Sequence, residues 1–261
     1  SLKIVALIQA RMNSKRLPGK AMLKINGKTV IQIIFGRLKE AKEIDGIILS
    51  TSLSKENDVL VEHSKKIGLK YYRGSENNLI SRHLGASNTL KADAILKVTA
   101  DCPLVDPKLI DKMVKAYRKN PQIDFITNCL PPTYPDGLDL DIISRPALER
   151  VNKEIKEPFH REYFAAYIMQ HPDAFNIQNV KNKKNLSHHR WTLDFKEDFE
   201  FIKKVFLHFK GKKIFFMEDV LRFIGKNPEV LKINKHRVDK TIIHDIRSNA
   251  YHTEFKKLKN S

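Results

Sequence analysis

Apolar and polar residues alternate along the first half of the chain in blocks that predict buried strands followed by helices. Short apolar runs predict strands at residues 4–8, 46–50, 71–72 and 94–98. Between the first two strands, apolar residues recur at helical spacing from Thr29 to Glu40. Strands that alternate with amphipathic helices are typical of a mostly parallel sheet covered on both faces. We therefore expect residues 3–124 to form a doubly wound α/β unit.

Two local signals predict where further helices begin in this half of the chain. Ser54 precedes a first turn that contains Glu56 and Asp58, which is the pattern of a capped helix with an acidic first turn. Asp106 is followed by Pro107, and an acidic N-cap with proline at the first helical position is a second start signal.

The second half of the chain is less regular. Prolines and a Pro-Asp-Gly turn at 135–137 interrupt the apolar pattern of residues 125–193, in which we expect one helix at 161–170. We expect this segment to be a small lobe over the site, inside a single domain that spans residues 1–261, because no long linker divides the sequence. Two helices should follow, one after Asp194 and one near Glu218.

Composition narrows the class of protein. Of 261 residues, 41% are apolar and 30% are charged, and no apolar run approaches the roughly 18 residues of a membrane span. Only Cys102 and Cys129 are present, without metal-ligand spacing, so we expect a cytoplasmic protein. The net charge of +18 favours anionic partners. The lysines are scattered and no aromatic residues interleave with them, so we expect no nucleic-acid partner.

The loop after the first strand carries the most informative chemistry. Four cations and one hydroxyl lie within residues 9–20, namely Arg11, Ser14, Lys15, Arg16 and Lys20. Ligands of α/β sheets bind at the carboxyl ends of strands, and such a loop can surround a polyphosphate with side-chain charge and backbone N–H groups. The loop matches neither a Walker motif nor a dinucleotide-binding turn. It predicts a phosphate site of another kind.

The same loop, Ile-Gln-Ala-Arg-Met-x-Ser-x-Arg-Leu-Pro-Gly-Lys at 8–20, resembles the signature loop of the cytidylyltransferases that activate sugars as CMP conjugates. This family includes CMP-Kdo synthetase and the acylneuraminate cytidylyltransferases, and the spore coat polysaccharide biosynthesis protein F branch is the most similar. Further matches are Thr-Ala-Asp-Cys-Pro-Leu at 99–104, Pro-Asp-Gly-Leu-Asp at 135–139, Arg-Glu-Tyr at 161–163 and Arg-Trp-Thr-Leu-Asp-Phe-Lys-Glu-Asp at 190–198.

The resemblance implies a fold, an activity and partners. The fold would be α/β, a Rossmann-like nucleotidyltransferase similar to GT-A enzymes, with a three-layer sandwich, a mostly parallel mixed sheet and a small inserted lobe. The activity would be the CTP-dependent activation of a sugar or sugar acid as a CMP conjugate, with release of pyrophosphate, for surface polysaccharide or glycoconjugate biosynthesis. Mg²⁺ is the implied cofactor. A homodimer formed through residues 130–165 is the implied assembly.

The resemblance also implies which residues act. The catalytic group would comprise Arg11, Arg16, Lys20 and Asp101. Asp101 and Asp194 would hold Mg²⁺. Asp101 follows the predicted strand 94–98, and Pro103 prevents that strand from continuing, so its carboxylate should project at the edge of the sheet. Asp194 stands just before a predicted helix and can equally be its N-cap, and both roles can coexist.

The implied nucleotide contacts are Gln9, Ala10, Arg11, Ser14, Lys20, Thr51, Arg73 and Arg82, and the implied acceptor contacts are Asp136, Asp139, Arg161 and Glu162. Structural explanations stay open for several of them. Ser75 can cap a helix in which Arg82 only forms an ion pair, and Asp136 with Gly137 can simply form a turn.

One short motif also matches a second enzyme class. Asp139-Leu140-Asp141 has the D-x-D pattern of GT-A glycosyltransferases, which use a nucleotide-sugar donor. The tripeptide follows a proline turn, and the cationic loop at 9–20 is better matched to a triphosphate than to a diphosphate donor. The acceptor stays open among a 2-keto-3-deoxy sugar acid, another sugar and a phosphorylated polyol.

Overall fold

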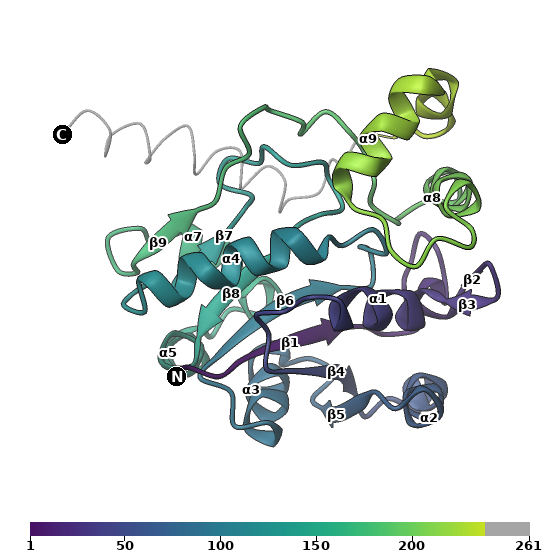
Figure 1. Ribbon diagram of the computed structural model, residues 1–261. Coiled ribbons are helices and arrows are strands. Elements are labelled where there is room, and N and C mark those ends of the chain that lie inside the picture. Colours follow the sequence, from purple (N-terminus) through teal and green to yellow (C-terminus); the bar gives the residue numbers. More distant parts are fainter. Residues whose placement is uncertain (238–261) are drawn as a thin grey trace.

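A single mixed sheet organises residues 1–237, which are the part of the chain described by this computed structural model (Figure 1). Its strands run in the order β5-β4-β1-β6-β8-β7-β9. They are β1 (Ile4–Gln9), β4 (Gly46–Ser52), β5 (Lys70–Gly74), β6 (Ala94–Thr99), β7 (Phe125–Thr127), β8 (Asp141–Ser144) and β9 (Ile177–Asn179). The first four are parallel, β8 is antiparallel to both neighbours, and β7 pairs with β9 in parallel. A hairpin of β2 (Lys24–Ile25) and β3 (Lys28–Thr29) lies apart from this sheet.

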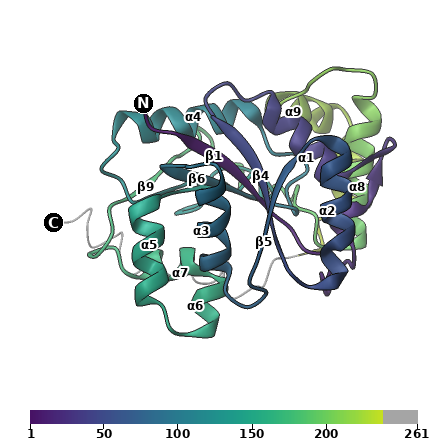
Figure 2. The same ribbon diagram turned by 90° about the horizontal axis from the view of Figure 1, so that it is seen from below.

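Helices cover both faces of the sheet. They are α1 (Val30–Lys39), α2 (Asp58–Ile67), α3 (Leu79–Thr89), α4 (Pro107–Lys119), α5 (Arg145–Glu154), α6 (Pro158–Glu162), α7 (Phe164–Gln170), α8 (Lys196–His208) and α9 (Met217–Lys226). Three 3₁₀ turns complete the described elements, namely η1 (Lys20–Met22), η2 (Lys55–Asn57) and η3 (Pro228–Ile233). Figure 2 shows α3 and α5 together on the face of the sheet away from α4.

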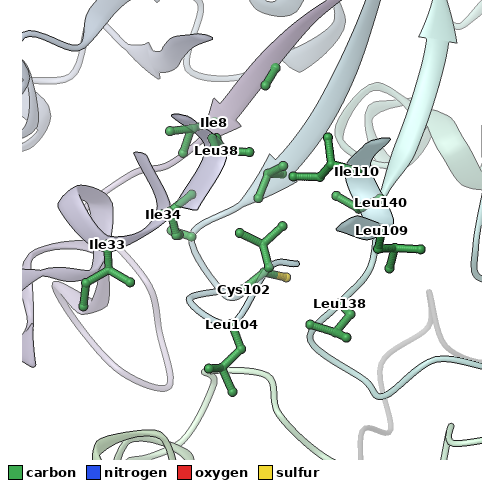
Figure 3. Close-up of a cluster of buried hydrophobic side chains, with 14 of the residues drawn as sticks. Ile8, Ile33, Ile34, Leu38, Cys102, Leu104, Leu109, Ile110, Leu138 and Leu140 are labelled. Carbon is green, nitrogen blue, oxygen red and sulfur yellow. The ribbon is translucent and has the colours of Figure 1, made fainter. Parts of the chain in front are cut away.

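Successive side chains of β1 point to opposite faces of the sheet, and they pack into two apolar layers. Ile4, Ala6 and Ile8 pack with residues of α1, α4, α8 and α9, whereas Val5 and Leu7 pack with residues of α3, α5 and α7. Figure 3 shows the first layer, in which the side chains of α1 and α4 lie around the segment that follows β6. The expected three-layer sandwich around a mostly parallel mixed sheet is therefore confirmed.

The predicted strands and the start of α4 are confirmed. The Asp106 carboxylate accepts from the backbone N–H groups of Lys108 and Leu109 at 2.7 and 3.2 Å, and thus caps α4. Two other expectations were wrong. Ser54 makes no capping bond, since the 3₁₀ turn η2 intervenes before α2 begins at Asp58. The helix expected at 161–170 is two helices, α6 and α7, that meet at Tyr163.

The segment expected as a lobe, residues 125–193, contributes β7, β8 and β9 to the central sheet and α5, α6 and α7 to one of its faces. Its irregular loops border the cavity described below. No helix within residues 1–237 combines the length and the apolar character that a membrane span requires.

Candidate active site

A cavity of about 1540 Å³ opens where β1 and β6 end. Gln9 and Thr99, the last residues of these two strands, both line it. The other walls come from the loop after β1, from residues 129–141, from α6 and from residues 185–194. This is the edge of an α/β sheet at which ligands bind.

Lys20 joins two carboxylates that are far apart in the sequence. Its ammonium lies 2.6 Å from Oδ1 of Asp101 and 3.0 Å from Oδ1 of Asp194, and it also donates to the carbonyl oxygen of Leu193 at 3.0 Å. Gly19, at φ 67°, turns the chain immediately before Lys20. The structure thus brings together three of the residues that sequence reasoning singled out.

Lys20 and the nearby carboxylates shift one another's pKa values. Burial alone would lower the pKa of Lys20, but attraction by Asp101 and then Asp194 raises it above its ordinary value. Burial raises the pKa of Asp101, Lys20 opposes that shift, and repulsion by Asp194 and Asp139 adds to it. The ammonium is therefore the counterion that allows two carboxylates to stand close together.

The cap alternative for Asp194 was wrong. Phe195 is the N-cap of α8, and the carboxylate that caps this helix belongs to Asp198, which accepts from the backbone N–H of Phe195 at 2.8 Å. The carboxylate of Asp194 is directed to Lys20 instead. A backbone hydrogen bond of 2.8 Å from Leu193 to the carbonyl of Asp101 ties the two aspartate segments together.

Further cations stand on the wall formed by the loop after β1. Arg11 and Arg16 line the cavity together with Ala10, Ser14 and Lys15. The Arg11 guanidinium lies 3.6 Å from the Glu162 carboxylate across the cavity, and both side chains are about half exposed. The Arg16 guanidinium lies 5.2 Å from the centre of the Phe195 ring. One wall of the cavity is thus strongly positive.

Gln9 is held by a buried histidine that sequence reasoning missed. Nε2 of His83 lies 3.2 Å from the side-chain oxygen of Gln9, and its Nδ1 lies 2.9 Å from the Ser50 hydroxyl. Burial holds the pKa of His83 well below its ordinary value, so the ring is neutral at physiological pH.

The two arginines considered for the nucleotide occupy different surroundings. Arg82 lines the cavity, is only 3% exposed and donates to the carbonyl of Ser75 at 3.2 Å. Its Nε has no hydrogen-bond partner within residues 1–237. Burial lowers the pKa of Arg82 to about 10, although Glu76 raises it. The cap of α3 is Asn78, whose side chain accepts from the N–H of Ser81, so the alternative in which Ser75 caps this helix was wrong.

Three of the expected contacts do not line the cavity. Arg73 is held beside β4 by Asp58 at 2.6 Å and by the carbonyl of Ser52 at 3.0 Å. Thr51 is fully buried within β4. Arg161 donates a long bond of 3.5 Å to the carbonyl of Asn152.

The remaining acceptor candidates, Asp136, Asp139 and Glu162, do line the cavity. Asp136 is anchored through its backbone, which donates to the carbonyl of His189 at 2.9 Å and accepts from the N–H of Trp191 at 2.6 Å. Lys97 and Asp141 are partners across β6 and β8, and both line the cavity. Sequence reasoning noted Asp141 only within the Asp139-Leu140-Asp141 motif and missed Lys97, although a lysine that interrupts the apolar run of β6 is a local signal for it.

Gly137 shapes this wall, and we predict that Gly137→Ala destabilises the fold by about 2 kcal/mol or more. Its φ is 109°, and an added Cβ would lie 2.4 Å from the backbone carbonyl carbon of Trp191. Urea unfolding measures the loss. Gly36→Ala is the control, because Gly36 lies in α1 with open space around it and should gain up to about 1 kcal/mol. Equal stability of both variants would contradict the prediction.

The two aspartates offer a donor set that suits a hard cation. Within residues 1–237, no three His, Cys, Asp or Glu side chains are placed to hold a metal together. Mg²⁺ binds oxygen ligands and is commonly held by one or two carboxylates plus water and phosphate oxygens. Asp101 and Asp194 already share one cation, the Lys20 ammonium, so their oxygens fit such a site.

Comparison with known proteins places this chain among nucleotide-transferring enzymes. The family model described as cytidylyltransferase matches residues 5–258. A solved cytidylyltransferase from Leptospira borgpetersenii is 34% identical, covers 93% of this chain and 99% of its own, and superposes with a TM-score of 0.85. The spore coat polysaccharide biosynthesis protein SpsF of Bacillus subtilis is 27% identical over 234 residues, which are 87% of this chain and 95% of that protein.

A third relative supports the fold. The structure of a CMP:2-keto-3-deoxy-manno-octonic acid synthetase complexed with CTP is 18% identical and covers 79% of this chain and 99% of its own, with a TM-score of 0.61. The resemblance noted in the loop after β1 is thereby confirmed along nearly the whole sequence. This chain belongs to the cytidylyltransferase family.

Proposed function

We propose that this protein is a Mg²⁺-dependent enzyme that transfers CMP from CTP to a sugar or sugar acid and releases pyrophosphate. The observation that carries the proposal is the cluster of Lys20, Asp101 and Asp194 at the carboxyl ends of β1 and β6, beside a cationic loop. The relatives agree with it, since one is named for spore coat polysaccharide biosynthesis and another was solved with CTP. The product would serve surface polysaccharide or glycoconjugate biosynthesis.

The reaction forms one phosphorus–oxygen bond and breaks another. A hydroxyl oxygen of the acceptor attacks the α-phosphorus of CTP, and the bond from that phosphorus to the oxygen bridging the β-phosphate breaks. Pyrophosphate leaves with the electron pair, and the proton of the acceptor hydroxyl passes to the solvent. Lys20, Arg11 and Arg16, which line the cavity, would neutralise the charge that grows on the leaving group. Catalysis of this kind depends on positioning and electrostatics.

The two aspartates would hold the metal, and Mg²⁺ there would supply a Lewis acid that polarises phosphoryl oxygens. Lys20, which is paired with both carboxylates, would donate to the oxygens of the triphosphate. Asp136, Asp139 and Glu162 on the opposite walls would orient the acceptor through its hydroxyl groups.

Nucleotide selection provides the direct test. Calorimetric titration with CTP, UTP, GTP, ATP and UDP-glucose in the presence of Mg²⁺ should show a preference for CTP, and a pyrophosphate-release assay across sugars and sugar acids should then identify the acceptor. A preference for UDP-glucose would contradict the proposal and favour glycosyl transfer.

Arg82 and Arg73 make a matched pair for this titration. Arg82→Ala should weaken CTP binding roughly tenfold to 100-fold, because a hydrogen bond to a charged group contributes about 1.5–3 kcal/mol. Arg73→Ala should leave CTP affinity unchanged and only lower thermal stability, since Arg73 is tied to Asp58 away from the cavity. An equal loss of CTP affinity in both variants would contradict the prediction that Arg82, and not Arg73, contacts the nucleotide.

A further inference from the structure

Asp198 is a buried carboxylate surrounded by donors. Its side chain is fully buried and accepts from Nε and Nη2 of Arg190, both at 2.8 Å. It also accepts from the backbone N–H groups of Asp194 at 3.0 Å and Phe195 at 2.8 Å. The side-chain amide of Asn234 donates to it at 2.9 Å. These bonds lower its pKa despite burial, so it stays charged.

A helix cap alone does not require this arrangement. Asp219 stands at the same position of α9, where it accepts from the backbone N–H of Phe216 at 2.8 Å. Its side chain is 15% exposed, and its ionic partners, Arg222 and Lys212, are more than half exposed. Asp198 makes the same cap but is fully buried. It also accepts from the backbone N–H of Asp194, whose carboxylate contacts Lys20.

Arg190 connects this carboxylate to the other side of the cavity. Its side chain is 8% exposed, and its Nη1 lies 3.9 Å from Oδ2 of Asp136 while its other nitrogens bind Asp198. Its backbone carbonyl accepts from the Asn234 amide at 3.2 Å. One buried guanidinium thus links the segment before α8 to the wall that carries the acceptor candidates.

The backbone of residues 190–194 is consequently held at both ends. Near its start the N–H of Trp191 donates to the carbonyl of Asp136 at 2.6 Å, and at its end the N–H of Asp194 donates to Asp198 at 3.0 Å. Without the Asp198 carboxylate, the N–H of Asp194 would lose a charge-assisted bond and Arg190 would lose its two-point partner. The carboxylate of Asp194 would then be free to leave the position opposite Asp101.

We propose that Asp198, held by Arg190, is the positioning residue for Asp194 and thereby sets the affinity of the site for its divalent cation. This inference rests on the proposed function, in which Asp101 and Asp194 hold the metal. Asp198 itself touches neither nucleotide nor metal in this scheme and acts through the Asp194 backbone. Outer partners of metal ligands are typically worth about 10-fold to 100-fold in metal affinity or activity.

The test compares Asp198→Asn with Asp219→Asn. Binding of Mn²⁺, followed by electron paramagnetic resonance in the presence of saturating CTP, should weaken about 10-fold to 100-fold in Asp198→Asn. The kcat should fall by a similar factor with little change in KM for the acceptor. Asp219→Asn removes a cap of the same geometry, so it should lower thermal stability while Mn²⁺ affinity stays within about twofold of the wild type. Equal Mn²⁺ affinity in the two variants would overturn the inference.

Two further variants separate the possible failures. Asp194→Asn should weaken Mn²⁺ binding at least as much as Asp198→Asn, and an unchanged affinity in Asp194→Asn would overturn the proposed metal site itself. Arg190→Lys keeps the charge but loses the two-point contact with Asp198, so it should weaken Mn²⁺ binding about tenfold. Should Asp198→Asn fail to fold, Arg190→Lys decides the matter, because wild-type Mn²⁺ affinity in that variant would overturn the inference.

Discussion

Lys20→Met is expected to move two binding equilibria in opposite directions. CTP affinity should fall about 100-fold, because the ammonium that would neutralise the triphosphate is lost. The affinity of the nucleotide-free protein for Mn²⁺ should rise at least about tenfold, since Asp101 and Asp194 lose a cation that now lies 2.6 and 3.0 Å from their oxygens. A lysine that only stabilises the fold would change neither equilibrium in this way.

Lys15→Met is the matched control for charge. Lys15 lines the same cavity but forms no ion pair with any residue between 1 and 237. Its loss should lower CTP affinity modestly and leave the Mn²⁺ affinity of the nucleotide-free protein unchanged. Titration of Mn²⁺ without nucleotide measures the difference, and a tighter Mn²⁺ complex in both variants would assign the effect to net charge instead of to the Lys20 contacts.

Local sequence patterns predicted the central strands, the position of Asp101 and the start of α4. β1, β4 and β6 each contain an apolar run, because parallel strands are covered on both faces. Asp101 was expected at the sheet edge because proline ends the preceding strand, and it lines the cavity there. Asp106 and Pro107 marked the start of α4 through capping alone.

Long-range packing decided the choices that the sequence left open. A carboxylate just before a helix suits both a cap and a ligand, and only the position of Lys20 directs Asp194 away from the helix. Asp198 takes over the cap because the first turn of α8 places it under the N–H groups of Asp194 and Phe195. Arg73 and Arg82 flank the same loop, and the face that each occupies depends on the packing of β5 and α3.

The break between α6 and α7 had no clear local signal. The pattern continues through Tyr163, but α7 buries five of its residues whereas α6 buries none. α7 therefore packs on the sheet, while α6 stands at the cavity and carries Glu162 opposite Arg11. Burial in three dimensions, which the linear pattern does not specify, separates one expected helix into two.

Asp101→Asn is expected to abolish most turnover while leaving CTP bound. The kcat should fall about 10³-fold, the scale of loss when a group that stabilises transition-state charge is removed. CTP affinity measured without divalent cation should stay the same or rise, because one negative charge near the triphosphate is removed and Lys20 is released from its 2.6 Å ion pair. This combination distinguishes a metal ligand from a residue that merely maintains the fold.

Asp139→Asn provides the comparison on the acceptor side. Asp139 lines the same cavity, and its charge raises the pKa of Asp101. Asp139→Asn therefore removes one negative charge from the same cavity without changing Asp101 or Asp194. We expect Asp139→Asn to raise KM for the acceptor with a much smaller loss of kcat and with Mn²⁺ affinity retained. If Asp139→Asn instead lost Mn²⁺ binding as fully as Asp101→Asn, the metal would lie toward the acceptor wall. The assignment of Asp194 as the second ligand would then be wrong, because a cation bound between Asp101 and Asp139 would not need the carboxylate that Lys20 holds from the other side.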